Sequence, residues 1–392
     1  MSQQLINLSP DLLRLQNEGY EITVKDAHAV ISNIPYVDSS KQIRFGTLVS
    51  DLTLRGNITC RPSSHVMYFL GVQPCNKDGS PIQQIIHSCR KVRLTTDISP
   101  DMSFSNKPRS GYTDYYHKFT QYISIITAPA YSLDPNVKAK TFKPVLTPEE
   151  SEVFNYIDTN SGRAGITAIS STLKEQKIGV IGLGGTGSYI LDFVAKTPVQ
   201  EIHLFDADDF VQHNAFRSPG AASLSELRER QSKVDYHKSR YQKMHRGIVS
   251  HACFIDEDNV DMLRGLDFVF ISIDEGSAKK VIFNYLTAQK IAFVDVGIGI
   301  EVANDKLTGI LRTTLSTPDK NSHVDNYVPY QTGEEDEYAS NIQISELNAL
   351  NAVLAVIKWK KVCGYYHDHI KEYNSTYTIN AHMLVGEEEF AA

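Results

Sequence analysis

The sequence predicts an α/β protein in which a doubly wound parallel sheet follows a separate α+β or β-rich domain. From Lys177 onward, short apolar stretches alternate with amphipathic ones, as in KIGVIGL followed by TGSYILDFVAKT. Apolar strands without polar alternation are typical of a parallel sheet that helices cover on both faces. Before about residue 143, short β-rich runs alternate with turn clusters and show no sustained helical period.

Length sets the expected number of domains. A chain of 392 residues exceeds one ordinary domain. We place the boundary in the polar, proline-containing stretch at 143–150, which predicts domains over residues 1–150 and 151–392. In the first domain we expect a helix around Leu12 and several strands between 42 and 142, including ISIITA at 123–128.

The second domain alternates between expected strands and expected helices. The strands are KIGVIGL, EIHLFDA, DFVFISI and AFVDVGI. The helices are TGSYILDFVAKT, one long amphipathic segment over 223–244, a segment after DFVFISI and a last one over 344–361. Because the carboxyl ends of parallel strands share one edge of a sheet, motifs at those ends should converge.

Composition excludes several functional classes. The net charge of -7, with no long Lys/Arg block, speaks against nucleic acid as a partner. No apolar run has the length of a membrane span, and MSQQLINLSPDLLRLQ lacks the features of a signal peptide, so we expect a cytoplasmic protein. The five cysteines are scattered without a CxxC pair, which predicts neither a disulfide nor a zinc site.

A glycine-rich loop directly follows the first apolar strand of the second domain. Its sequence GLGGTG fits the GxGxxG pattern, with glycines at Gly182, Gly184, Gly185 and Gly187. Glycines let the main chain approach phosphate groups, and N–H groups at a helix start stabilise their charge. About twenty residues further on, Asp206 ends the next strand, where a carboxylate binds ribose hydroxyls. This Rossmann-like arrangement predicts a bound nucleotide; the alternative is a tight turn without a ligand.

The residues after Asp206 point to a particular nucleotide. The stretch DADDFVQHNAFR over 206–217 resembles the motif DxDxVxxxNLxR of the ThiF-like superfamily of adenylyltransferases, which contains the ubiquitin-activating enzymes. Asp206, Asp208, Asn214 and Arg217 stand in register with that motif. The resemblance, to bacterial enzymes of the ubiquitin-activating type, covers about residues 162–364 and implies ATP rather than NAD.

The same resemblance implies roles for further residues. Asp274, after the strand DFVFISI, would bind Mg²⁺, and Arg163, shortly before the glycine strand, would reach the γ-phosphate across a homodimer interface. The residues implied at the nucleotide are Asp206 at the ribose and Asn214, Arg217 and Lys233 at the triphosphate, with Asp208 in the same site.

The chemistry of adenylation gives these residues a common task. Activating a carboxylate with ATP requires neutralising a triphosphate and a leaving pyrophosphate, for which Arg, Lys and Mg²⁺ are suited. Taken singly, Arg217 and Lys233 could be solvated charges and Asp208 a helix cap. An NAD-binding oxidoreductase would leave Arg217, Lys233 and Asp274 without a task, and a non-catalytic nucleotide-binding scaffold predicts the loss of at least one of them. Both remain as alternatives.

The resemblance also implies protein partners. The substrate would be the C-terminal carboxylate of a ubiquitin-like protein, and by analogy the first domain would recruit a conjugating enzyme. Two CxxC pairs, usual in sulfur-carrier activators, are absent, and no cysteine lies between residues 313 and 344, where ubiquitin-type activators usually carry one. We therefore expect a hydroxyl acceptor, if one exists: Ser340 first, with Ser316 and Ser322 as alternatives. A turn or helix-capping role for Ser340 is the competing interpretation.

Overall fold

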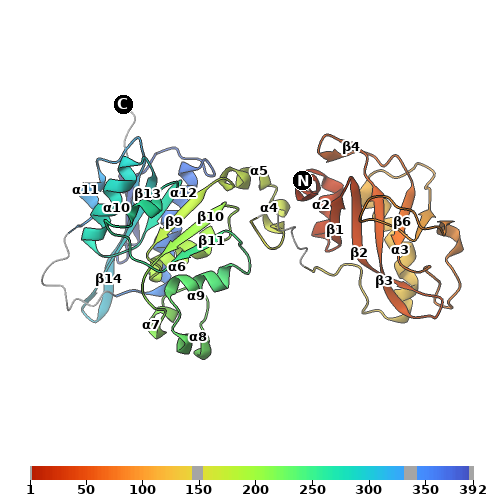
Figure 1. Ribbon diagram of the computed structural model, residues 1–392, viewed down its shortest axis with the longest axis horizontal. Helices are drawn as coiled ribbons and strands as arrows, with labels where there is room; N and C mark the ends of the chain where they lie inside the picture. Colours follow the sequence, from red (N-terminus) through yellow and green to blue (C-terminus); the bar gives the residue numbers. More distant parts are fainter. Residues whose placement is uncertain (1, 144–152, 331–341, 388–392) are drawn as a thin grey trace. The chain divides into compact units, whose positions relative to one another are not determined.

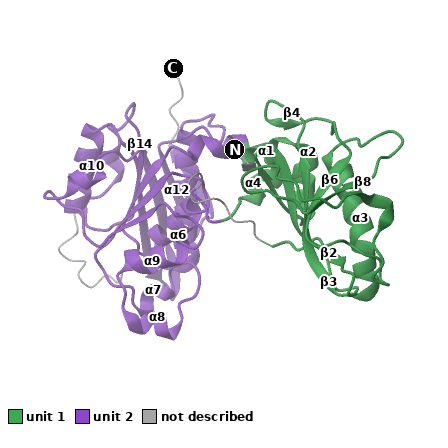
Figure 2. Cartoon of the chain, turned by 45° about the vertical axis from the view of Figure 1, so that its right-hand side comes forward, with its two compact units in different colours: residues 1–148, 156–167 green, residues 149–155, 168–392 purple. Residues whose placement is uncertain are grey.

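The protein divides into two compact units (Figures 1 and 2). The computed structural model describes residues 2–143, 153–330 and 342–387. The first unit comprises residues 1–148 and 156–167, and the second comprises 149–155 and 168–392. The helix that carries Arg163 therefore packs with the first unit, where it contacts α2.

The first unit is an α+β domain built on a six-stranded sheet in the order β1-β2-β3-β6-β8-β7. All neighbouring strands in this sheet are antiparallel. One apolar cluster joins the sheet to α1, α2 and α3. The elements of the unit are α1 (Ser2–Leu8), α2 (Pro10–Asn17), β1 (Glu21–Lys25), β2 (His28–Val37), β3 (Ile43–Asp51), β4 (Leu54–Arg55), β5 (Ile58–Thr59), β6 (Val66–Leu70), η1 (Gln83–Ile85), β7 (Ile86–Ser88), β8 (Met102–Ser105), α3 (Tyr115–Leu133) and α4 (Thr159–Ala164).

The longest helix of this unit replaces an expected strand. ISIITA, which we expected to be a strand, lies inside α3. The side chain of Asp114 caps the helix by accepting the main-chain N–H of His117 at 2.7 Å. The buried side chains recur with helical spacing, as at Tyr115, Phe119, Tyr122 and Ile126. The strand prediction was wrong because tertiary packing of this face overrides the β-preference of three isoleucines.

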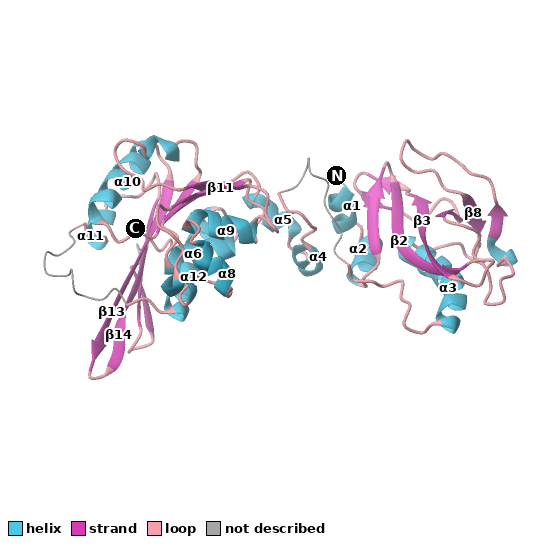
Figure 3. Cartoon of the chain, turned by 60° about the horizontal axis from the view of Figure 1, so that its bottom comes forward, coloured by secondary structure: helices cyan, strands magenta, loops and turns pink. Residues whose placement is uncertain are grey.

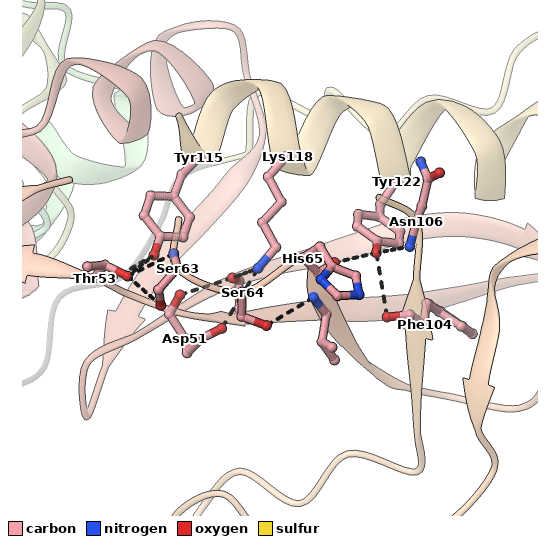
Figure 4. Close-up of polar contacts among 12 residues, drawn as sticks. Asp51, Thr53, Ser63, Ser64, His65, Phe104, Asn106, Tyr115, Lys118 and Tyr122 are labelled. Atoms are coloured by element: carbon pink, nitrogen blue, oxygen red, sulfur yellow. Dashed lines mark hydrogen bonds and ion pairs between the residues drawn. The ribbon is translucent and has the colours of Figure 1, made fainter. Parts of the chain in front are cut away.

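A buried lysine ties α3 to the sheet beneath it. Figure 4 shows the side chain of Lys118 reaching from α3 toward Asp51 and the neighbouring strands. Its ammonium group donates to the hydroxyl of Ser50 at 2.7 Å and lies 3.8 Å from the Asp51 carboxylate. Burial lowers the pKa of Lys118 from 10.5 to about 8. On either side, the hydroxyls of Tyr115 and Tyr122 bond main-chain groups of the strands and loops.

The second unit contains an eight-stranded sheet in the order β11-β10-β9-β12-β13-β14-β15-β16. The first five strands in that order are parallel, and the last three join them antiparallel. The elements are α5 (Thr167–Ser170), η2 (Ser171–Leu173), β9 (Lys177–Ile181), α6 (Gly185–Val194), β10 (Glu201–Phe205), α7 (Gln212–Ala215), α8 (Leu224–Glu229), α9 (Lys233–Tyr241), β11 (Ile248–His251), η3 (Val260–Leu263), β12 (Phe268–Ile271), α10 (Gly276–Ala288), β13 (Ala292–Ala303), β14 (Lys306–Ser316), α11 (Val324–Tyr327), α12 (Ser345–Val362), β15 (Asn374–Thr378) and β16 (Met383–Glu387).

Helices cover both faces of this sheet, so the doubly wound fold class is confirmed. Figure 3 shows α10 and α11 on one side of the strands and α6, α9 and α12 on the other. Each side has its own apolar cluster, to which alternate residues of the strands contribute. Trp359 of α12 is fully buried in one of them, with its ring 5.9 Å from that of Phe270. No helix in the described part of the chain combines the length and apolar character that a membrane span needs.

Two features of the second unit differ from the expected pattern. The long helix expected over 223–244 is two helices, α8 and α9, because Arg230 adopts a left-handed conformation with φ 49° and Ser232 starts a new helix as its N-cap. The expected strand AFVDVGI extends into a long hairpin of β13 and β14. Its two turn residues, Asn304 and Asp305, have φ 51° and 57°, the conformation of a type I′ turn.

Candidate nucleotide-binding site

The glycine loop lies between β9 and α6, as its sequence predicts. Gly182 has φ +84°, and a Cβ atom there would lie 2.6 Å from the carbonyl oxygen of Ser272. Gly187 is equally confined, because a Cβ atom would lie 1.9 Å from the oxygen of Gly182. At Gly184, which precedes the first residue of α6, a Cβ atom would meet nothing within 4 Å. The loop is thus packed tightly against β12 and open at the helix N-terminus, where a phosphate could approach.

Asp206 holds this loop in place. Its side chain is 6% exposed and follows β10 directly. One carboxylate oxygen accepts the N–H of Leu183 at 2.7 Å, and the other accepts the N–H of Asp208 at 2.9 Å. Each oxygen keeps a further lone pair that could receive a ribose hydroxyl.

Lys233 lies beside Asp206 and Asp208. Its ammonium group is 2.5 Å from the Asp208 carboxylate and 3.4 Å from that of Asp206. The main-chain N–H of Lys233 donates to the carbonyl of Asp208 at 2.8 Å, so the start of α9 is fixed to the loop after β10. The Lys233 side chain is 8% exposed, whereas that of Asp208 is 56% exposed. The structure therefore brings together the three predicted charged residues.

Asn214 and Arg217 supply buried hydrogen-bond donors at the same place. The side-chain oxygen of Asn214 accepts the N–H of Val211 at 2.9 Å. Within the described residues, Nδ2 of Asn214 and Nε of Arg217 are buried without a partner. Burial lowers the pKa of Arg217, while the negative charges of Asp274 and Asp208 oppose that shift. Buried donors without acceptors call for a ligand that accepts hydrogen bonds, and phosphate oxygens fit this need.

Asp274 follows β12 and is exposed at the same edge of the sheet. Two residues earlier, the hydroxyl of Ser272 donates to the carbonyl of Gly182 at 2.7 Å, which ties the Asp274 segment to the glycine loop. Mg²⁺ is commonly held by one or two carboxylates together with phosphate oxygens. A carboxylate beside the loop therefore fits a role in holding Mg²⁺ on a bound triphosphate.

Other predicted residues lie elsewhere. Arg163 is exposed on α4, in the first unit, whereas the residues described above belong to the second. Ser340 lies outside the described residues. Of its alternatives, Ser316 is 2% exposed at the end of β14, while Ser322 is exposed.

Sequence reasoning missed a polar residue of α12 that supports the loop. Asn348 is fully buried, and its oxygen accepts the hydroxyl of Thr186 at 3.0 Å. A Cβ atom at Gly185 would collide with the Asn348 amide, so this glycine lets α12 pack against the first turn of α6. An asparagine within the apolar helix 344–361 was a usable signal, since buried amides need partners.

Two family models match the chain. The model described as a domain of unknown function (DUF6791) matches residues 10–159, and the ThiF family model matches residues 162–383, which is more than half of the chain. The chain belongs to the ThiF family. The resemblance to the ThiF-like superfamily that the sequence predicted is confirmed.

Individual proteins show more distant similarity to this ThiF-family chain. A tRNA threonylcarbamoyladenosine dehydratase from Haemophilus influenzae is 26% identical over 134 residues, which are 32% of this chain and 48% of that relative. The chain thus spans about half the length of that relative. A crystal structure of E. coli MccB with ATP has a TM-score of 0.45 at 17% identity, covering 59% of this chain and 68% of MccB. PaaA gives 0.46 at 16% identity, covering 57% of this chain and 76% of PaaA.

Proposed function

We propose that this ThiF-family protein uses ATP to adenylate the C-terminal carboxylate of a ubiquitin-like protein. The observation that carries this proposal is the pair of buried donors on Asn214 and Arg217 that have no partner among the described residues, with Arg217 close enough to Asp208 and Asp274 to feel their charges. A nicotinamide dinucleotide carries a pyrophosphate only, so an NAD site would have less use for this set of donors and for Asp274. The nature of the acyl substrate follows from the resemblance of residues 206–217 to ubiquitin-activating enzymes.

The chain's own residues would divide the work as follows. Bound ATP supplies the electrophilic α-phosphorus and pyrophosphate as a leaving group. Asp206 would hold the ribose, and the N–H groups at the start of α6 would bind the phosphates. Asn214, Arg217 and Lys233 would donate to oxygens on which negative charge grows as pyrophosphate leaves. Asp274 would hold Mg²⁺ on the phosphates.

Exchange of labelled pyrophosphate into ATP tests the proposal. Wild-type protein should catalyse exchange that depends on a candidate ubiquitin-like protein, and Asp274→Ala should abolish it while the far-ultraviolet circular dichroism stays unchanged. Glu275→Ala, one residue further along the same exposed loop, is the matched control and should retain exchange. Exchange at the wild-type rate in Asp274→Ala would remove Asp274 from its role. Exchange without any acyl partner would contradict the proposed substrate.

We further propose a homodimer in which Arg163 of one protomer serves the nucleotide site of the other. The proposal rests on the family resemblance and on the exposure of Arg163. A protomer with Arg163→Ala mixed with one carrying Asp274→Ala should regain part of the exchange activity, since one of the two composite sites is intact. Inactive heterodimers, confirmed by mass spectrometry, would count against sharing.

Transfer of the acyl group to the enzyme and then to a conjugating enzyme is a further proposal. An acyl-adenylate is activated enough to be attacked by a hydroxyl, and Ser340 and the exposed Ser322 are the candidates. An adduct formed with ATP and the ubiquitin-like protein should survive thiol reductant and be cleaved by mild base. Release by reductant would point to a cysteine instead.

A further inference from the structure

A cluster of buried charges lies on the sheet outside the nucleotide site. Asp295 of β13 is fully buried and contacts two cations: Lys279 of α10 at 2.9 Å and Arg312 of β14 at 2.5 Å. The side chains of Lys279 and Arg312 are 5% and 14% exposed. Asp325 bonds the nearby Tyr330 hydroxyl at 2.6 Å but is itself exposed. Among the described residues, this cluster of one buried carboxylate and two largely buried cations carries one net positive charge, and such a charge is costly unless an anion pairs with it.

Strand register places this cluster beside the glycine loop. Asp295 pairs with Ile271 of β12, and Ile271 pairs with Ile181, the last residue of β9 before the loop. Neighbouring strands are about 4.8 Å apart, so Asp295 lies two strands, roughly 10 Å, to one side of that position. Asp206 follows β10, on the other side of β9. A nucleotide whose ribose is held by Asp206 leaves the β12–β13 side free for a second substrate.

Next to Arg312, strand β13 has glycines at two positions that would otherwise carry side chains. Residues 295, 297 and 299 share one face of β13, and the latter two are glycines. Arg312 pairs with Gly297 and lies over it, because a Cβ atom at Gly297 would be 2.9 Å from Nη2 of Arg312. A Cβ atom at Gly299 would meet nothing within 4 Å. Ile310, which pairs with Gly299, is 47% exposed. Arg312 therefore covers this face at Gly297 and leaves it open at Gly299, where an extended chain could lie with its main chain close to the strand.

Arg312 has donors left for such a chain. Nη1 donates to the Thr314 hydroxyl at 2.6 Å, and Nη2 donates to Asp295 at 2.5 Å. A guanidinium carries five N–H donors, so these two bonds leave three. Asp295 holds the group in one orientation, which lowers the entropy lost when an anion binds.

We infer that Arg312, which lies over Gly297, recognises the carboxylate of the acyl substrate, and that the open main chain at Gly299 forms the floor on which the last residues of that substrate lie. The inference rests on the proposed function and assigns a specificity-determining residue to it. This positive charge would attract the carboxylate to the edge of the sheet next to Asp274, which would hold Mg²⁺ on a bound nucleotide. Substrates with small final residues fit best, because the floor admits a main chain at close range.

Nuclear magnetic resonance of the arginine side chains tests the inference without requiring catalysis. The Nε–H signal of Arg312 is assigned by its loss in Arg312→Lys. Titration of the full-length protein with N-acetyl-glycylglycine should shift this signal, whereas the C-terminal amide of the same peptide should not. The signal of Arg61, whose guanidinium donates to main-chain carbonyls in the first unit, is the internal control and should stay in place. An equal response to acid and amide, or no response to either, overturns the inference.

A second test of the inference uses the variant Gly299→Val. The open space at this position accepts a side chain without disturbing the fold, yet the side chain would occupy the floor. The variant should melt at the wild-type temperature and lose the peptide-dependent shift. In pyrophosphate exchange, Gly299→Val and Arg312→Gln should raise KM for the ubiquitin-like protein roughly 10- to 100-fold, the loss expected for one charged hydrogen bond, with KM for ATP unchanged.

Lys306→Val, at the far end of the same hairpin, is the matched control and should keep both constants. A wild-type KM in both Gly299→Val and Arg312→Gln overturns the inference. If wild-type protein shows no exchange with any ubiquitin-like protein, the proposed function fails, while a carboxylate-selective shift at Arg312 would still stand.

Discussion

Buried basic side chains in both units couple the stability of this protein to pH, and one from each unit illustrates how. Lys118 lies under α3, and His237 lies behind Lys233 on α9. Both have a lowered pKa, so in both cases the folded state favours the neutral form. Such a group costs most stability below its folded pKa, and the cost disappears as pH rises through the range where the unfolded chain is protonated and the folded chain is not.

For Lys118, the pH range over which stability changes is alkaline. The pKa is about 8 in the folded protein and 10.5 in the unfolded chain, so the first unit should gain stability as pH rises from 8 to 10.5. The burial penalty at neutral pH is on the order of 3 kcal/mol. Lys118→Met should remove the slope, as measured by hydrogen exchange of peptides from α3. Lys138→Met, at an exposed lysine of the same unit, should keep it. A slope that persists in Lys118→Met would show that another group causes it.

For His237, the pH range over which stability changes is acidic. Burial, helped by the charges of Arg240 and Lys233, lowers its pKa from 6.5 to about 3. The second unit should therefore lose about 1.4 kcal/mol per pH unit as pH falls from 6.5 toward 3, because only the unfolded chain takes up the proton. His237→Phe, which keeps the ring packed between Phe210 and Tyr236, should reduce this dependence in urea titrations and leave the part due to His245, whose pKa burial lowers to about 4. His213→Phe, at an exposed site, should not, and equal slopes in both variants would contradict the assignment.

Single residues of the site differ in how far sequence could predict them. Asp206, Asp208 and Lys233 lie at strand ends or helix starts, where local pattern fixes their place, and the structure brings them together. Asn348 and Arg312 depend on packing between distant segments: Asn348 meets Thr186 across 162 residues of chain. The local sequence does not predict such a long-range contact; its only signal is a polar residue in an apolar stretch.

Among the elements, the hairpin of β13 and β14 has the clearest local cause. Asn304 and Asp305 both have positive φ, which Asn and Asp tolerate and Gly adopts without strain. Asp305→Gly should raise the stability of the second unit by a few tenths to about 1 kcal/mol, since Asn-Gly is the preferred type I′ pair. Chemical denaturation measures the gain. Asp305→Val should lose stability, and an unchanged midpoint in both variants would argue against a strained turn.

Four parallel strands of the second unit, β9, β10, β12 and β13, were easier to predict than α3 or the break between α8 and α9. Buried parallel strands read as uninterrupted apolar runs, whereas α3 carries the β-branched run ISIITA on a helix whose period shows only over its whole length. The break between α8 and α9 has a local signal, the N-cap Ser232, whose hydroxyl accepts the N–H of Asp235 at 3.2 Å. An amphipathic pattern that runs across such a cap hides the break.

At the scale of the whole molecule, the two units carry separate cores, so a ligand of one should protect that one first. The proposed ATP residues other than Arg163 all belong to the second unit. ATP with Mg²⁺ at a hundred times its Kd should stabilise that unit by about 2.7 kcal/mol and leave the first unit unchanged. Hydrogen exchange measures the stability of the two units separately. Asp206→Ala should abolish the effect, and protection of β2 and β3 by ATP would contradict the assignment of the site to the second unit alone.

The burial of Trp359 has an optical consequence. It is the sole tryptophan of the chain, and it lies fully buried on α12 against the sheet of the second unit. Light that excites indole but not phenol therefore selects this one position. A red shift of the emission marks the separation of α12 from the strands, even in a molecule whose first unit is intact. Calorimetry, which records the heat of both units, and emission, which records one, should accordingly disagree wherever the two units melt apart.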